Sequence, residues 1–226
     1  MDFAFTGSMK KKTGPTKKWT SKQIKEEVVK FDAKIEAAKE REGDSEVRDA
    51  VLEKAQFLKD EAQDYPAAEI VFREAYKLSG GPSRKIEVLF EILLMNIEKF
   101  DIESVKKDIA TCTQLVEDGA DWDKKNKLKV FEGVYCMIIR DFKKASDLLL
   151  SCVASFTCVE LLDYKTFVFY AVVMAMVSQD RKTLKKGVIH SSDIKAIISD
   201  SLKKYVESFY NCEYKPFFEA FVDILD

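Results

Sequence analysis

The chain has 226 residues, of which 46% are hydrophobic and 34% are charged, and its formal net charge is −2. This much apolar material predicts a folded core rather than a disordered chain, and the length fits one large domain or two small ones. Because basic and acidic residues balance, a general nucleic-acid binder is disfavoured. Eight glycines and four prolines are too few for the many tight turns of a sheet protein, which favours long helices with short loops.

The sequence carries no membrane or secretion signal. Its longest apolar run, residues 167–177, is well short of the roughly 20 residues that span a bilayer, so it predicts a buried helix. The first residues lack the basic start, apolar stretch and small-residue cleavage site of a secretory signal. Five cysteines without a CxxC pair are typical of buried, reduced thiols. We therefore expect a protein of the cytoplasm and nucleus.

Residues 1–19 are predicted to be a flexible tag or linker. Gly7-Ser8-Met9 resembles the remnant of an expression tag before a second start methionine, and lysines surround Gly14-Pro15. Such polar ends are rarely ordered. The remaining residues, 20–226, are predicted to form one helical-repeat domain.

The first predicted helix begins at Thr20 or Ser21, either of which can cap it. An apolar stripe follows at spacings of three and four residues, formed by Ile24, Val28, Phe31, Ile35 and Ala38. The stripe is shorter than the three to four heptads that indicate a coiled coil. A helix docked on its own domain is therefore favoured over a dimerisation zipper.

Turn signals then divide the chain into further helices. Gly43-Asp44-Ser45 precedes a second helix, and Pro66 suits the first turn of a third. Gly80-Gly81-Pro82 is a break, after which residues 86–100 and 105–116 have helical apolar patterns.

A degenerate repeat underlies these helices. Its template is an aromatic residue at a turn, a small residue where helices cross, and a large residue that fills the groove; copies start 33 to 40 residues apart, with a weaker one near Arg181. The residues assigned to this packing are Tyr65, Ala68, Phe72, Ala75, Gly133, Phe142, Ala145, Leu149, Tyr214, Phe217 and Phe221. The pattern resembles tetratricopeptide repeats. Because isolated helix pairs cannot bury their apolar faces, it predicts an all-α, right-handed solenoid of antiparallel helix pairs.

The sequence offers little material for catalysis. His190 is the only histidine, and the surrounding polar residues favour a loop and helix cap. The cysteines lack the spacing of a zinc site, and no glycine-rich phosphate loop is present. We predict no enzyme activity, no cofactor, no metal and no small-molecule substrate.

One basic cluster leaves a nucleic-acid alternative open. Lys124, Lys125, Lys127 and Lys129 follow Trp122 and, with the lysines at 10–18, could contact phosphates. The same segment has an apolar opposite face, so a solvated helix start is the favoured interpretation. A helical RNA-binding protein remains the alternative.

Two segments are distinctive, and they begin with Asp121-Trp122-Asp123 and Asp163-Tyr164-Lys165. With the stretch 209–214, they resemble the proteasome non-ATPase regulatory subunit 6 family, whose members belong to the lid of the 26S proteasome. The resemblance runs from about Lys22 to the end. A related signalosome or translation-factor subunit is the alternative.

The resemblance implies a non-catalytic scaffold in ubiquitin-dependent protein degradation, with other lid and base subunits as its protein partners. It also implies a PCI module after the helical array, so we expect a fragment that stops before the module's winged helix. Its cut end would expose apolar surface from Phe217, Phe218, Phe221 and Leu225. Trp19 and Tyr210 are candidate interface anchors, although local packing is favoured for both.

Overall fold

The computed structural model describes residues 19–41 and 43–225, and these contain helices but no strand. The expected features of residues 1–18 lie outside the described residues. The helices are α1 (Ser21–Glu40), α2 (Asp44–Asp60), α3 (Tyr65–Leu78), α4 (Pro82–Glu98), α5 (Ile102–Glu117), α6 (Trp122–Ile138), α7 (Phe142–Cys152), α8 (Tyr164–Ser178), α9 (Arg181–Leu184), α10 (Ser192–Lys195), α11 (Asp200–Asn211) and α12 (Tyr214–Leu225), with a 3₁₀ turn η2 (Val153–Ser155) and a π-helical turn η3 (Lys185–Ile189). The predicted all-α class is confirmed.

Short polar side chains start most of these helices. At Thr20 a capping box forms with Gln23, which confirms the predicted start of α1. The other side-chain caps are Asp64, Asp101, Asp141, Asp163, Asp180, Ser191 and Ser199. Each accepts a hydrogen bond from a backbone N–H that the helix leaves unpaired. The helix starts are thus encoded locally.

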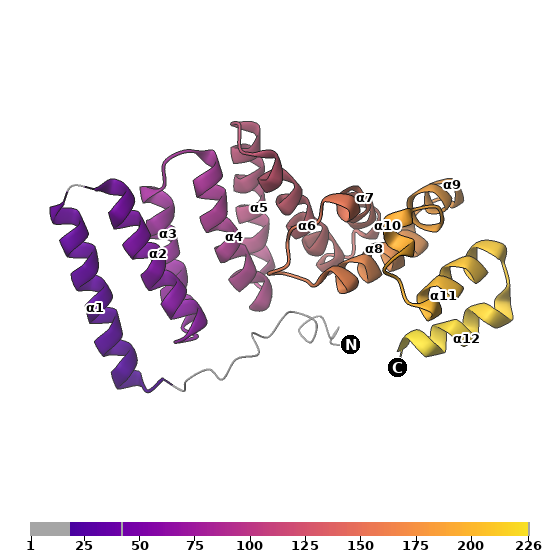
Figure 1. The fold of residues 1–226 in the computed structure, drawn as a ribbon, viewed down its shortest axis with the longest axis horizontal. Helices are drawn as coiled ribbons and strands as arrows, with labels where there is room; N and C mark the ends of the chain where they lie inside the picture. Colours follow the sequence, from indigo (N-terminus) through magenta and orange to yellow (C-terminus); the bar gives the residue numbers. More distant parts are fainter. Residues whose placement is uncertain (1–18, 42, 226) are drawn as a thin grey trace. The chain divides into compact units, whose positions relative to one another are not determined.

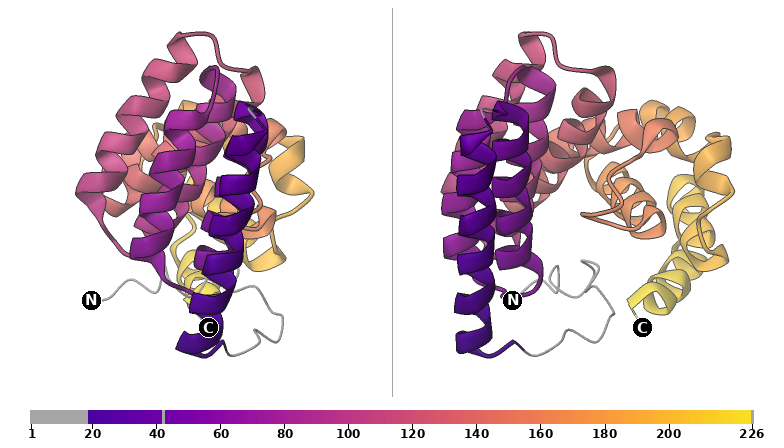
Figure 2. Two further views of the ribbon diagram at one scale, coloured as in Figure 1. Left: turned by 90° about the vertical axis from the view of Figure 1, so that its left-hand side faces the viewer. Right: turned by 60° about the vertical axis from the view of Figure 1, so that its left-hand side comes forward.

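The chain divides into two compact units, and the boundary falls between Lys125 and Asn126, inside α6. In the first unit, α1 to α5 stack in chain order and alternate in direction (Figures 1 and 2). The helix α1 packs against α2 and buries Ile35 and Ala38. The docked helix predicted for this segment is confirmed.

The helix α4 forms the core of this unit. Ten of its 17 residues are buried, because α3 and α5 both pack against it, while Glu87, Glu91 and Glu98 leave one stripe of the helix open to solvent. A helix with so wide an apolar surface is stable only when neighbours cover it. The consecutive pairing predicted from the repeat therefore has its physical basis here.

A buried polar cluster joins three helices of the first unit. Asp108 on α5 is only 4% exposed, and its two carboxylate oxygens accept hydrogen bonds from Arg73 on α3 at 2.6 and 2.8 Å. The amide nitrogen of Asn96 on α4 donates to the same carboxylate at 3.3 Å. Paired charges raise the pKa of Arg73. The geometry is directional, so this cluster fixes how α3, α4 and α5 align.

The second unit is built from shorter pieces. Its α7 packs on α8, and α11 packs on α12 as a hairpin (Figure 1). Between them, α9, η3 and α10 form a run of short turns. Gly133 on α6 lets α7 approach closely, since a Cβ there would lie 2.7 Å from a methyl group of Leu149. Among the described residues no helix is long and apolar enough to cross a membrane.

Candidate protein-interaction surfaces

The residues assigned to repeat packing have two kinds of surroundings. Most of those on α3, α6 and α7 are core residues: Ala68, Phe72, Ala75, Ala145 and Leu149 are fully buried, and Gly133 is buried. Tyr65, Phe142 and Phe217 are half-buried. Tyr214 and Phe221 on α12 are 76% and 39% exposed. The template residues of α12 therefore lie partly in solvent.

Four of the five cysteines are buried, as expected, but Cys212 is exposed because it follows the last residue of α11 as its C-cap. Burial raises the pKa of the Cys112 and Cys158 thiols to about 12, whereas a reactive cysteine needs a lowered pKa. His190 ends η3 and the next residue, Ser191, caps α10, as the polar-loop interpretation predicts. No group of His, Cys, Asp or Glu that could hold a metal occurs among the described residues.

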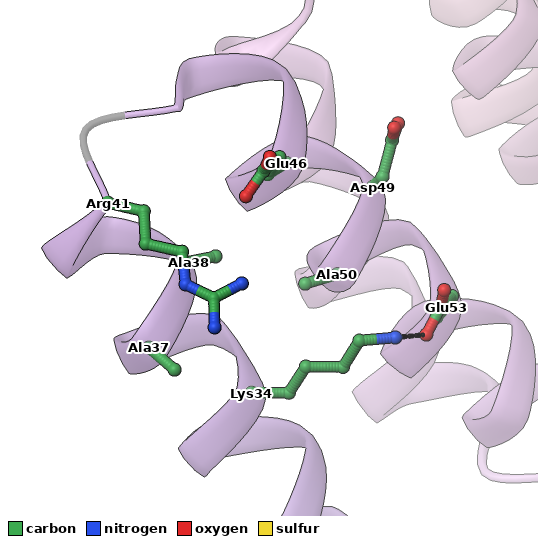
Figure 3. A pocket seen from close by; sticks show the side chains of 8 residues that line it. All are labelled: Lys34, Ala37, Ala38, Arg41, Glu46, Asp49, Ala50 and Glu53. Carbon is green, nitrogen blue, oxygen red and sulfur yellow. Dashed lines mark hydrogen bonds and ion pairs between the residues drawn. The ribbon is translucent and has the colours of Figure 1, made fainter.

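A shallow pocket lies between α1 and α2 (Figure 3). Its volume is about 340 Å³, and it is lined by Lys34, Ala37, Ala38, Arg41, Glu46, Asp49, Ala50 and Glu53. Lys34 pairs with Glu53 across it. Sites for small molecules are mostly apolar with a few polar groups. This lining is mostly charged, so it does not fit such a site.

The Asp163-Tyr164-Lys165 segment has a local structural role. Asp163 caps α8 by accepting the Thr166 hydroxyl at 2.6 Å and its N–H at 3.1 Å, and these bonds lower the pKa of Asp163. The hydroxyl of Tyr164 donates to the Val153 carbonyl at 2.9 Å. Lys165 is exposed. Asp163 therefore starts α8, and Tyr164 ties the helix to η2.

The Asp121-Trp122-Asp123 segment is instead exposed, and Trp122 is 66% exposed. Its backbone is anchored because the Asp121 N–H donates to the Ser83 hydroxyl at 3.2 Å. In the basic cluster that follows, Lys124 pairs with Glu87 and Lys127 with Glu160. These ion pairs engage half of the four lysines that the RNA alternative requires.

An apolar stripe on α12 faces solvent. Tyr214, Phe218 and Val222 recur every four residues and are 76%, 61% and 58% exposed. The opposite face of α12 packs on α11 through Phe217 and Tyr205, whose ring centroids are 4.7 Å apart. Of the phenylalanines expected to be exposed, Phe218 and Phe221 are, but Phe217 is half-buried because its ring stacks on Tyr205. The expectation missed Val222, although its spacing from Tyr214 would have indicated it.

Trp19 and Tyr210 are occupied by local contacts, as the favoured interpretation held. The indole N–H of Trp19 donates to Glu61 at 3.0 Å, and its ring meets Phe57 edge-on. The guanidinium of Arg181 lies 4.6 Å from the centroid of the Tyr210 ring. Neither ring is therefore free as an interface anchor.

Comparison with known proteins gives a consistent result. The model of the family described as 26S proteasome subunit RPN7 matches residues 16–187. The 26S proteasome non-ATPase regulatory subunit 6 of Oryza sativa subsp. japonica is 39% identical over 202 residues, which are 88% of this chain and 51% of the relative. The 26S proteasome regulatory subunit rpn7 of Schizosaccharomyces pombe is 33% identical over 211 residues, which are 90% of this chain and 52% of the relative. The chain thus spans about half the length of the curated relatives it matches, and it belongs to the 26S proteasome subunit RPN7 family.

Proposed function

We propose that this chain is the helical-repeat part of a non-catalytic scaffold subunit in the lid of the 26S proteasome regulatory particle. The family match over residues 16–187 carries the proposal. The relatives are named as regulatory, non-ATPase subunits, and a stacked helical array suits a protein that binds others through its surface. The expected partners are other lid and base subunits.

The proposed mechanism is surface complementarity. Stacked helices with directional polar links such as Arg73–Asp108 hold exposed groups in fixed positions. Preorganised surfaces bind with a smaller entropy loss than flexible ones. Exposed apolar groups, which include Trp122 and the α12 stripe, then supply binding energy at a few positions. By holding the lid together, the subunit would support ubiquitin-dependent degradation in the cytoplasm and nucleus.

The test is affinity purification of the tagged full-length protein from its own cells, followed by quantitative mass spectrometry. We expect lid and base subunits in near-equal amounts, with the tagged protein itself in the same ratio. Recovery of signalosome subunits, translation factors or RNA in place of proteasome subunits would contradict the proposal. Fluorescence microscopy of the same tagged protein tests the expected distribution between cytoplasm and nucleus.

A further inference from the structure

The exposed side chain of Trp122 contributes little to the folding of this chain. It is the first residue of α6 and is 66% exposed. An indole offers a large apolar area that proteins usually bury, and exposed tryptophans are enriched among the residues that dominate protein interfaces. No ring contact or hydrogen bond of its side chain is found within the described part of the chain. The side chain is thus available to a partner.

Four exposed carboxylates lie close to this tryptophan in the sequence. Glu117, Asp118, Asp121 and Asp123 are exposed and lie within six residues of it, and none makes an ion pair with a described residue. The two aspartates at the start of α6 have a structural explanation, because carboxylates favour the positive end of a helix. Glu117 and Asp118 are not explained in this way.

Glu117 and Asp118 stand at the wrong end of a helix. Glu117 is the last residue of α5 and Asp118 is its C-cap, where the helix dipole is negative and disfavours carboxylates. Carboxylates also end α1, α2 and α4, but each of those ends carries a lysine in its last turn or at its C-cap, whereas the end of α5 carries none. The charges of Glu117 and Asp118 are therefore not offset within their own helix end.

The turn between α5 and α6 holds these groups in place. Gly119 has a positive φ of 102°, a conformation that glycine adopts most readily. The Asp121 N–H is bonded to Ser83 on α4, and Lys124 is paired with Glu87 on the same helix. The turn is therefore tied at two points to α4, and its side chains are presented on a supported surface.

We propose that these five residues, Glu117, Asp118, Asp121, Trp122 and Asp123, which we call the Trp122 turn, bind a basic segment of another protein. An Arg or Lys of the partner lies over the indole, which attracts cations, and neighbouring basic residues face the four carboxylates. The proposal rests on the chain's proposed role as a binding scaffold, but not on which assembly it joins.

Charge also decides against nucleic acid at this surface. Arg84 and Lys125 are the exposed cations next in sequence to the residues that tie the turn to α4, which are Ser83 and Lys124. The four carboxylates of the turn outnumber these two cations. Binding to phosphates requires a cluster of Lys or Arg. An exposed aromatic ring with four exposed carboxylates nearby in the sequence therefore fits a basic peptide better than a phosphate backbone.

The direct test uses the whole 226-residue chain and a short fluorescein-labelled peptide in which Arg alternates with Ala. Fluorescence anisotropy should show binding that weakens with salt, and a matched peptide with Glu in place of Arg should not bind. Trp122→Ala should weaken binding at least about tenfold, as expected for an interface anchor. Ile70→Ala, which removes another exposed apolar side chain in the same unit, should leave the affinity unchanged.

A second variant isolates the charge. The double variant Glu117→Gln, Asp118→Asn should weaken binding and flatten its dependence on salt, because it removes two screened attractions. Circular dichroism of each variant should match the parent, since the altered side chains are exposed. Equal affinity of the parent and Trp122→Ala, or tighter binding of a single-stranded oligonucleotide than of the Arg peptide, would overturn the proposal.

Photocrosslinking in the full-length protein separates this proposal from the proteasome assignment. A benzophenone amino acid at position 122 should crosslink to a peptide rich in Lys or Arg; an acidic or purely apolar peptide would sink the proposal. If lid subunits are recovered but the crosslinked segment is not basic, only the partner chemistry is wrong. If basic segments are captured without proteasome subunits, the proteasome assignment is wrong, but the Trp122 turn still binds a basic segment.

Discussion

The two units of this chain reach stability by different means. In the first, five consecutive helices of 14 to 20 residues stack side by side, and α4 buries ten of its 17 residues between its neighbours. In the second, residues 181–195 contain two four-residue helices and a π-helical turn. Helices this short gain little from their own hydrogen bonds and depend on caps and on the few side chains they bury.

The difference between the two units predicts where substitutions should reduce stability most. In the stacked unit, each core side chain supports several helices, so one deletion affects the whole stack. In the second unit, individual caps at Asp163, Asp180, Ser191 and Ser199 each start one helix. We therefore expect large, shared effects from substitutions of core side chains and small, local ones from substitutions of the caps.

The largest expected effect is Phe72→Ala in the stacked unit. Phe72 is fully buried on α3, and removing such a ring costs about 3–5 kcal/mol. Its counterpart in the repeat template, Leu149→Ala on α7, should cost about 2–5 kcal/mol. Hydrogen exchange with mass spectrometry should show loss of protection across α2 to α4 in the first variant and across α7 and α8 in the second. Deprotection confined to α3 would contradict the shared-core argument.

A smaller effect is expected for the polar cluster. Asp108→Leu leaves the half-buried Arg73 without its main partner, which should cost about 1.5–3 kcal/mol in unfolding free energy. The double variant Arg73→Met, Asp108→Leu should recover much of this loss, because well-packed apolar pairs often replace ion pairs at no cost. Urea unfolding monitored by circular dichroism measures both. A double variant no more stable than the single one would show that the cluster itself supplies stability.

The closely packed glycine tests the second unit. Gly133→Ala brings a Cβ to 2.7 Å from a methyl of the fully buried Leu149. Overpacking costs about 1–3 kcal/mol, and the better helix propensity of alanine returns about 1 kcal/mol. A net loss of about 1 kcal/mol should lower the midpoint of urea unfolding. Gly80→Ala is the control, because nothing lies within 4 Å of its added Cβ.

The parts of the fold that sequence could predict are those with local causes. Thr20 at the start of α1 was predicted because capping depends on residues within one turn. By contrast, the pairing of Arg73 with Asp108 spans 35 residues, and nothing local marks it. The boundary after Lys125 lies inside a continuous helix, so no glycine or proline signals it. The weak repeat near Arg181 placed Leu184 and Val188 in one helical pattern. Both are buried, but Leu184 ends α9 and Val188 lies in the π-helical turn η3.

The candidate surfaces show the same limit. The exposure of Trp122 could not be predicted from its neighbours in sequence. A tryptophan beside charged residues at the start of a helix can be either buried or exposed. The exposed stripe of α12 was partly foreseeable from its spacing, but apolar residues on opposite faces of one helix do not reveal which face is covered. Both properties depend on tertiary contacts.

The smallest effect concerns the cap of α8 and its dependence on pH. Hydrogen bonds from Thr166 lower the pKa of Asp163 in the folded chain, so its charge stabilises the fold above the unfolded pKa of about 3.9. This contribution is lost as the pH falls through the lower, folded-state pKa. Asp163→Asn keeps a capping oxygen but cannot ionise, so its stability should vary less with pH than that of the parent. Urea midpoints should differ little at about pH 6, where asparagine caps nearly as well as aspartate, and the difference between the two proteins should change as the pH falls below about 4.

Asp163→Ala removes the cap altogether and should cost about 1 kcal/mol at neutral pH. If Asp163→Asn and the parent kept the same difference at every pH, the charge on Asp163 would have no part in holding α8, and only its hydrogen bonds would remain as the cause.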